Sequence, residues 1–525
     1  MARAPMTRRW MGRSRAAVLA VAAVLLTVTA CSSAAPSTGG SSGSGEKPTL
    51  TVGIDSALAS LNPALDNRGN DGSMIIRTLA YEPLLRTSPD GSFTPGLATS
   101  WKYVDDKRTV FEITLRTGAV FSDGAPVNAA AVKTWLEYYA NSGGAFSKRL
   151  KFSAIETEGE SVVRLRLPAP EPTLLTQLSD MWTWGLIGSP AAAAKPEQLV
   201  TQTFGAGPYM LDPKETVEGD HNTYVPNPHY YDQSKIRFSK IVFKFVVDPA
   251  SMLQAAATGQ LDVALGQAAV AAGAKSAGLN VIHEPFGSSE IYFMDRAGTL
   301  VKPLGDAKVR QALNYAIDRK AIAAGLANGY AAPITAHYTD DAWNPAKADA
   351  AYPYDPAKAK ALLAEAGYPD GFSFKIVTVT TGNRQNEALA VAENLRKVGV
   401  TMEVVAVPAA QFIDEMKKGI YSAFYTTRKT SMAWDVGNDM WSNVSITDPF
   451  KLGRPAQLDV LYNQTLAATD PAPYLMQMAD YVTDQSLTLP VLLQDAVWYA
   501  RPGIEGITFG FSKPAPFIID WIPTG

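Results

Sequence analysis

The sequence predicts an α/β fold that divides into more than one lobe. Alternating apolar residues mark several strands, and apolar residues at helical spacing mark helices, some of which lie between strands. The chain is also long: removal of an N-terminal signal segment would leave roughly 495 residues, more than a single hydrophobic core usually serves.

Strands are expected where apolar side chains recur at every second residue. This alternation occurs at residues 50–54, 111–115, 163–167 and 241–247. Asp123 and Gly124 follow the second of these segments and form a turn signal. Alternate side chains of such strands pack against a core, while the others face solvent.

Helices are clearest in the second half of the chain. Residues 309–317 place apolar side chains at the spacing of one helix face, and Asp306 stands where it caps that helix. A second helix is expected to begin at Asp355, which precedes a proline, and to stop at Gly367.

A β-α-β unit follows this helix. A strand is expected near residues 374–379, then a helix through Leu389 and Leu395 that ends near Gly399, then a strand near residues 402–407. This order of elements is typical of an α/β lobe.

The N-terminus predicts export and a lipid anchor. Residues 1–15 carry five arginines and no acid, and the apolar run over residues 16–29 is shorter than the roughly 20 residues that span a bilayer. The tetrapeptide ending at Cys31 (VTAC) resembles a bacterial lipobox, so we expect cleavage before Cys31 and lipidation of its thiol. Residues 32–47 are rich in Ser and Gly and predict a flexible tether. The arginine pair near the start leaves Sec and Tat export both open.

Charge and composition exclude several classes of function. Loss of residues 1–30 removes five positive charges and changes the net charge from −3 to −8, which argues against nucleic-acid binding. Cys31 is the only cysteine, so a disulfide framework or CxxC zinc site is excluded. The four histidines show no close metal-ligand spacing, HExxH is absent, and no local context supports a catalytic triad. We therefore expect no metal, no cofactor and no enzymatic activity.

Five segments, in order along the chain, resemble one protein family. They are residues 93–101 (FTPGLATSW), the 109–132 region with FSDG at its centre, residues 205–209 (GAGPY), residues 309–319 (VRQALNYAIDR) and residues 362–368 (LLAEAGY). Together they are similar to the family-5 extracellular solute-binding proteins of bacterial ABC importers, the peptide, nickel and opine group. These segments are expected to maintain the fold, so the resemblance leaves the substrate open.

The resemblance implies a two-lobed, periplasmic-binding-protein-like fold of type II, cluster C, with an additional subdomain. Two crossovers would join the lobes, which close on the ligand like a hinged trap. The implied boundaries are residues 48–85, 204–284 and 490–525 for lobe 1, 86–203 for its additional subdomain and 285–489 for lobe 2.

The resemblance also implies the function. We expect a monomeric extracytoplasmic lipoprotein that captures a short peptide or similar small organic solute and delivers it to ABC permease subunits. Alternatives within binding are a nickel chelate, an opine or an oligosaccharide. A secreted hydrolase and a peptide-sensing receptor are alternatives of other classes.

Candidate ligand contacts come from two sources. Peptide-binding relatives pair an acid of lobe 2 with the ligand's ammonium, and the comparable stretch here holds Asp435 first and Asp439 second. The other candidates are aromatic walls and flanking polar residues: Trp434, Trp441, Arg428, Trp182, Trp184, Trp498, Asn70 and Asp71. Trp182 and Trp184 would share one face if they lay on a strand.

Overall fold

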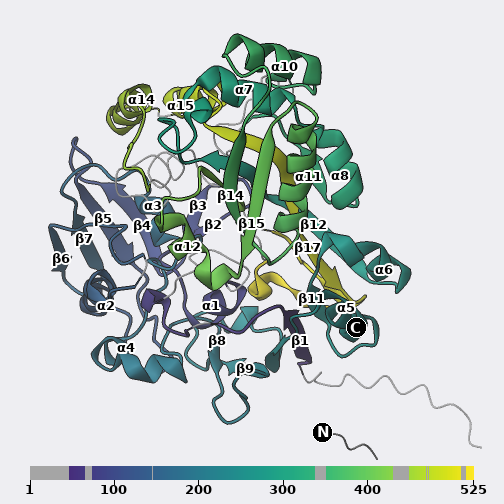
Figure 1. Ribbon diagram of the computed structural model, residues 1–525. Helices are drawn as coiled ribbons and strands as arrows, with labels where there is room; N and C mark the ends of the chain where they lie inside the picture. The colour runs from purple at the N-terminus through teal and green to yellow at the C-terminus, as the bar shows by residue number, and fades with distance from the viewer. Residues whose placement is uncertain are drawn as a thin grey trace, which may run out of the picture. The chain divides into compact units, whose positions relative to one another are not determined.

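The computed structural model describes residues 47–524, except 59, 66–73, 145, 337–349, 430–448, 469, 471 and 510–515. Figure 1 shows the arrangement of the strands and helices. The strands are β1 (Thr49–Ile54), β2 (Leu85–Thr87), β3 (Phe93–Pro95), β4 (Ala98–Tyr103), β5 (Val110–Leu115), β6 (Ala154–Glu158), β7 (Val162–Arg166), β8 (Tyr209–Leu211), β9 (His221–Pro226), β10 (Lys240–Phe245), β11 (Val263–Leu265), β12 (Asn280–Phe293), β13 (Ala331–Pro333), β14 (Ser373–Val379), β15 (Thr401–Val407), β16 (Ala423–Lys429), β17 (Thr488–Ala500), β18 (Ile504–Glu505) and β19 (Ile522–Pro523).

Helices separate many of these strands. The α-helices are α1 (Met74–Ala80), α2 (Ala129–Asn141), α3 (Leu174–Leu178), α4 (Pro190–Ala194), α5 (Pro249–Ala257), α6 (Ala271–Ser276), α7 (Ala307–Tyr315), α8 (Arg319–Leu326), α10 (Pro356–Glu365), α11 (Arg384–Arg396), α12 (Ala409–Lys417), α14 (Ala456–Ala467) and α15 (Ala472–Asp484). Short 3₁₀ helices are η1 (Pro63–Leu65), η2 (Pro196–Val200), η3 (Gln233–Lys235), η4 (Ala268–Val270), η5 (Lys302–Gly305) and η6 (Ile518–Asp520). Among the described residues, no helix is both long and apolar enough to cross a membrane.

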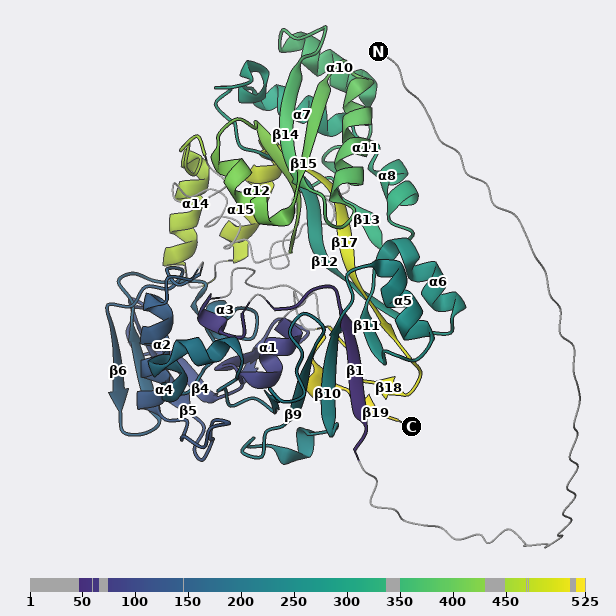
Figure 2. The ribbon, with the colours of Figure 1, turned by 60° about the horizontal axis from the view of Figure 1, so that its bottom comes forward.

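One mixed sheet runs through the described chain. Its strand order is β15-β14-β16-β12-β17-β11-β1-β10-β9-β8, with β13 paired to β17. The long strands β12 and β17 lie at its centre and pair antiparallel from Asn280–Ala500 to Tyr292–Thr488. Figure 2 shows both strands extending from the elements around β1 to the elements around β14. A separate antiparallel sheet has the order β4-β5-β7-β6.

The buried side chains form several distinct cores, and residues of β12 and β17 belong to more than one of them. The largest core joins β1, β10 and the four-stranded sheet, and we call the elements around it lobe 1. Two further cores lie on the two faces of β14 and β16, and we call the elements around them lobe 2. Fold class and lobes are as the sequence predicted; the boundaries given above remain a proposal.

The sheet of lobe 2 is covered on both faces, because its strands alternate between the two cores. On β12, Ile291 belongs to the core under α7 and α11, while the next residue, Tyr292, belongs to the core under α12, α14 and α15. Ile376 and Val377 divide in the same way on β14. Strands buried on both faces are typical of α/β lobes with helices on each side.

The predicted helix caps are present. Asp306 accepts a hydrogen bond from the Lys308 amide at the start of α7, and Asp355 accepts one from the Lys358 amide at the start of α10 (both 2.8 Å). Gly367 follows α10 with a φ of +90°, a conformation that favours glycine.

Two details differ from the predicted pattern. The strand expected over residues 241–247 ends at Phe245, and Val247 is exposed, because Asp248 next caps α5 by accepting from the Ser251 amide. Leu389 faces solvent on α11, whose packed face carries Val391 and Leu395 instead.

Two arginines of the 309–319 segment connect α7 and α8 to the first residues of β17 and to the residues just before it. Arg310 donates to the carbonyl oxygens of Gln485 and Ser486 (2.9 and 3.0 Å), and Arg319 donates to that of Pro490 (2.7 Å). Both side chains are buried. Burial lowers the pKa of Arg310 to about 10 and that of Arg319 to about 9, so desolvation of both guanidiniums is costly.

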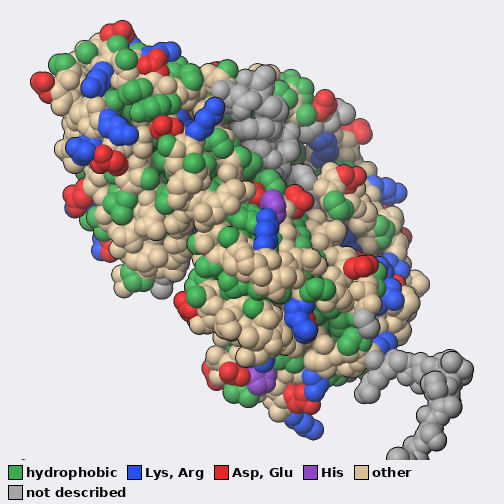
Figure 3. Space-filling model, turned by 90° about the vertical axis from the view of Figure 1, so that its right-hand side faces the viewer, with side chains coloured by type: hydrophobic (Ala, Val, Ile, Leu, Met, Phe, Trp, Pro, Cys, Tyr) green, Lys and Arg blue, Asp and Glu red, His purple; other side chains and the backbone are tan. Residues whose placement is uncertain are grey.

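Figure 3 shows one face of the molecule, on which Lys and Arg side chains lie among Asp and Glu side chains and do not gather into a basic patch. This face offers no extended cationic footprint of the kind that nucleic acid requires.

Replacement of Arg319 by Met is expected to lower the free energy of unfolding by about 3 kcal/mol, because buried carbonyl oxygens lose their donors. Urea denaturation followed by circular dichroism measures this change. The matched control is Arg396→Met on the exposed side of α11, expected within about 0.5 kcal/mol of the parent. Equal costs for the two variants would contradict the anchoring role.

Candidate functional site

Most of the predicted ligand contacts fall outside the described residues. Trp434, Asp435, Asp439 and Trp441 lie in the segment 430–448, and Asn70 and Asp71 lie in the segment 66–73. The predictions on these six residues therefore stay predictions. The described candidates are Trp182, Trp184, Trp498 and Arg428.

Trp182 and Trp184 differ in their surroundings. They lie in a bend and a turn after α3 and not on a strand, so the condition for a shared face is not met. Trp184 is fully buried: its ring packs against Tyr139 at 4.1 Å between centroids, and its indole N–H donates to the Phe146 carbonyl oxygen. Trp182 is half-buried, with the Arg149 guanidinium 4.0 Å from its ring centroid. Of the pair, only Trp182 offers surface to a ligand.

Trp498 and Arg428 lie on strands of the large sheet. Trp498, on β17, has no exposed surface and packs in the core of lobe 1. Arg428 is near the end of β16, and its guanidinium lies over the ring of Tyr292 at 5.3 Å. We retain Arg428 and Trp182 as candidates and assign Trp184 and Trp498 to packing.

A buried polar cluster that the sequence analysis did not identify lies on the α11 face of the lobe 2 sheet, opposite the face on which the Arg428 side chain packs. Glu387, in the first turn of α11, accepts from the Tyr425 hydroxyl (2.8 Å) and from the Gln494 amide (2.9 Å). The same amide donates to Ser289 (3.1 Å), whose hydroxyl also bonds Thr427 (2.8 Å). The cluster therefore joins α11 to β12, β16 and β17.

Burial dominates the electrostatics of this cluster. It raises the pKa of Glu387, although hydrogen bonds from Tyr425, Ser289 and Gln494 and the nearby Arg384 favour the charged form. Burial also lowers the pKa of Arg384. The Arg384 Nε is buried and has no hydrogen-bond partner within the described part of the chain.

The cluster lies near the carboxyl ends of parallel strands, where a binding site is expected. β14 and β16 are parallel, and α11 begins just after the carboxyl end of β14. Ligands of open α/β sheets bind outside the carboxyl ends of the strands. Residues 430–448, which contain the predicted acid and both predicted tryptophans, follow β16 directly in sequence.

Sequence patterns alone could not identify this cluster. Ser289 and Gln494 are 205 residues apart, and Glu387 is 107 residues from Gln494. The one local signal is the acid in the first turn of a helix that follows a strand, a position where acids are common for helix stability alone.

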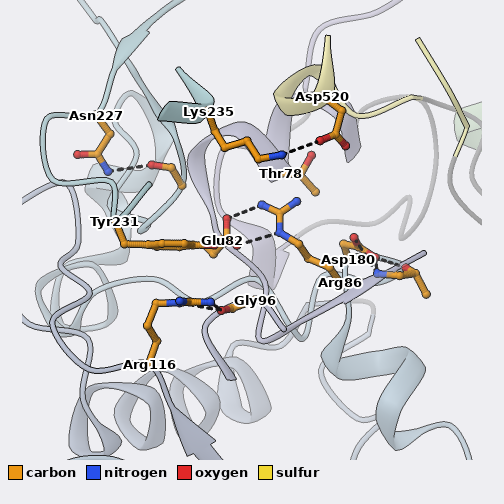
Figure 4. Close-up of polar contacts among 12 residues, drawn as sticks. Thr78, Glu82, Arg86, Gly96, Arg116, Asp180, Asn227, Tyr231, Lys235 and Asp520 are labelled. Carbon is orange, nitrogen blue, oxygen red and sulfur yellow. Dashed lines mark hydrogen bonds and ion pairs between the residues drawn. The ribbon is translucent and has the colours of Figure 1, made fainter. Parts of the chain in front are cut away.

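A cavity of about 580 Å³ lies in lobe 1, and none of the candidate residues named above lines it. The hairpin β2–β3, the turn at residues 230–235 and the C-terminal residues 517–520 line it. Figure 4 shows polar side chains in and around it, including Arg86 with its partner Glu82 and the Lys235–Asp520 pair. Within the described residues, no group of three His, Cys, Asp or Glu side chains is arranged to hold a metal ion.

Glu387→Gln tests the electrostatics of the cluster. Because the pKa of Glu387 is raised on folding, the folded state keeps this proton at higher pH than the unfolded state does. Its contribution to stability is therefore present below the ordinary Glu value of about 4.3 and declines as the pH rises through the raised pKa. We expect the urea midpoint of the wild type to fall as the pH rises from 4.5 to 8. In Glu387→Gln this fall should be absent. The exposed control Glu393→Gln should retain it, and parallel curves for wild type and Glu387→Gln would refute the assignment.

Comparison with known proteins identifies the family. Residues 92–451 match the family described as bacterial extracellular solute-binding proteins, family 5 Middle. The glutathione-binding protein GsiB of Salmonella typhimurium is 29% identical over 379 residues, which cover 70% of this chain and 71% of that protein. The probable D,D-dipeptide-binding periplasmic protein DdpA of Escherichia coli K12 is 27% identical over 391 residues, covering 71% of this chain and 73% of that protein.

A solved structure shares the fold. NikA of Brucella suis, in complex with Fe(III)-EDTA, superposes with a TM-score of 0.78 at 22% identity, covering 91% of this chain and all of that chain. The family match spans more than half of the chain and confirms the resemblance inferred from the motifs. The chain belongs to family 5 of the bacterial extracellular solute-binding proteins.

Proposed function

We propose that this protein captures a short peptide, or a similar small organic solute, between lobes 1 and 2 and presents it to an ABC permease without chemical change. The observation that carries the proposal is the family match over residues 92–451. Of the relatives named above, GsiB is a glutathione-binding protein and DdpA is named as a probable D,D-dipeptide-binding protein, and both ligands are short peptides.

The architecture supports capture by closure. β12 and β17 contribute to lobe 1 and to lobe 2, whose cores are separate. The β12–β17 register shifts between Pro285 and Gly287 and again between Ser289 and Glu290. Such irregularities bend a strand pair, so they favour a hinge at this position.

The proposed ligand contacts combine described and undescribed residues. Asp435 is proposed as the partner of the ligand's ammonium, with Asp439 as second choice and Trp434, Trp441, Asn70 and Asp71 beside them. Arg428 and Trp182 have accessible surface in the described chain, and Arg428 is a fixed cation for a ligand carboxylate. A ligand that carries both an ammonium and a carboxylate would be enclosed only if each group met a protein group of opposite charge, because burial of an unpaired charge is costly.

We further propose that the mature protein acts as a monomer outside the cytoplasm, anchored to the cell membrane through lipidated Cys31. The short apolar run before Cys31 and the Ser/Gly-rich tether after it support this proposal.

Peptide capture is tested by calorimetric titration of the full chain with di- to pentapeptides that have a free amino terminus. We expect binding, and we expect Asp435→Asn to weaken it at least about tenfold through loss of a charge-assisted hydrogen bond. Asp414→Asn, which removes an exposed carboxylate on α12, should leave the affinity unchanged. Lack of binding by every peptide, together with a single non-peptide compound released on denaturation, would overturn the substrate class.

Lipidation is tested with Cys31→Ala. The wild-type protein expressed in a bacterial host should enter the detergent phase on Triton X-114 partitioning, and its N-terminal peptide should carry the mass of a diacylglycerol. The variant, which lacks the acceptor thiol, should stay in the aqueous phase. A wild-type protein found in the aqueous phase with an unmodified Cys31 would exclude the anchor.

A further inference from the structure

We propose that the cavity in lobe 1 is a second binding site, separate from the cleft between the lobes, and that it takes a small organic carboxylate. Its volume of about 580 Å³ lies within the range of small-molecule sites, roughly 300–1,000 Å³. Its walls come from lobe 1 alone, so the site does not depend on closure of the two lobes.

A buried ion pair fixes the inner wall of the cavity. Glu82 has no exposed surface and binds the Arg86 guanidinium through two hydrogen bonds, from Nε (2.9 Å) and Nη2 (2.7 Å). The Tyr231 hydroxyl donates to the same carboxylate (2.9 Å). A bidentate pair of this kind holds the guanidinium in one orientation before any ligand arrives.

The remaining edge of Arg86 is available to a ligand. Nη1 has no acceptor among the described residues, and the side chain keeps 19% of its surface exposed. Figure 4 shows this nitrogen pointing away from Glu82. A guanidinium edge with two N–H groups, held in place from behind, matches the oxygen atoms of a carboxylate.

Two further cations line the same cavity. The Lys235 ammonium lies 3.5 Å from Asp520, and both side chains are about half exposed. Such an exposed pair contributes little to stability, so a ligand carboxylate can take the place of Asp520 at little cost. The Arg116 guanidinium lies 4.3 Å from the Tyr231 ring centroid and donates to the Gly96 carbonyl oxygen.

The acids around the cavity accept hydrogen bonds from neighbouring groups. Asp180 accepts hydrogen bonds from the amide and the hydroxyl of Thr87, and Asp232 accepts two from Ser234. Glu82 is occupied by Arg86 and Tyr231. The lining carries as many acids as cations, so the sign of the ligand follows from the guanidinium edge of Arg86 that the described residues leave open, which favours an anionic group at that position.

The apolar lining accommodates the body of the ligand. Pro89 and Pro95 from the hairpin, together with Phe517 and Ile519 from the C-terminal segment, line the cavity beside the charged groups. An anion with a compact hydrocarbon body would bury that body here, whereas an inorganic anion would leave this part of the lining unused.

The test uses the full chain and three probes, benzoate, succinate and citrate, titrated calorimetrically in low-salt buffer free of carboxylates. We expect at least one probe to bind with a Kd below about 10 mM, and we expect Lys235→Gln to weaken that binding at least about fivefold. The matched control is Lys308→Gln in lobe 2, which removes a lysine from an ion pair of similar exposure. It should change the Kd by less than about twofold.

A second variant guards against misfolding. Arg86→Gln alone would leave Glu82 as an unpaired buried charge, so the Glu82→Gln and Arg86→Gln changes are combined. This double variant should bind the probe at least about tenfold more weakly while its thermal unfolding remains cooperative. Failure of all three probes to bind would overturn the proposal. So would a Kd in Lys235→Gln equal to that of the wild type.

Discussion

The antiparallel pairing of β12 with β17 is the constraint on which both lobes depend. The two strands are about 200 residues apart in sequence, yet they pair from Asn280–Ala500 to Tyr292–Thr488. On β17, Trp498 belongs to the core of lobe 1, while Leu489 belongs to a core of lobe 2. One strand pair therefore serves both lobes, and any movement of one lobe against the other must bend it.

The arginines of the family-like helix segment act on this same pair. Arg310 and Arg319 direct their donors to backbone carbonyl oxygens at residues 485–490, where the chain enters β17. Their depressed pKa values show that burial is unfavourable for the charges themselves. The segment that most clearly indicates the family thus positions a strand, which explains why it carries no information about the ligand.

Local signals predicted local structure well. The caps at Asp306 and Asp355 and the stop at Gly367 depend on neighbours within a few residues, so the sequence contains all that is needed. The tryptophan pair shows the limit of prediction from neighbouring residues. Whether Trp182 and Trp184 share a face depends on the turns that follow α3, and those depend on packing against Tyr139 and Phe146. The Glu387 cluster and the lobe 1 cavity were missed for the same reason, since distant segments assemble both.

The Glu387 cluster and the lobe 1 cavity differ in how their polar groups are satisfied. At Glu387 both carboxylate oxygens are engaged by protein donors, and two of the partners, Ser289 and Gln494, lie on β12 and β17. Bending of the strand pair would therefore disturb a buried network, which couples the hinge to α11 and to the carboxyl edge of the lobe 2 sheet. At Arg86 the protein engages one edge of the guanidinium and leaves the other open. The fully bonded Glu387 cluster suits a region that must return to one geometry after the lobes move. The half-bonded Arg86 suits a rigid wall of a site that binds an anion.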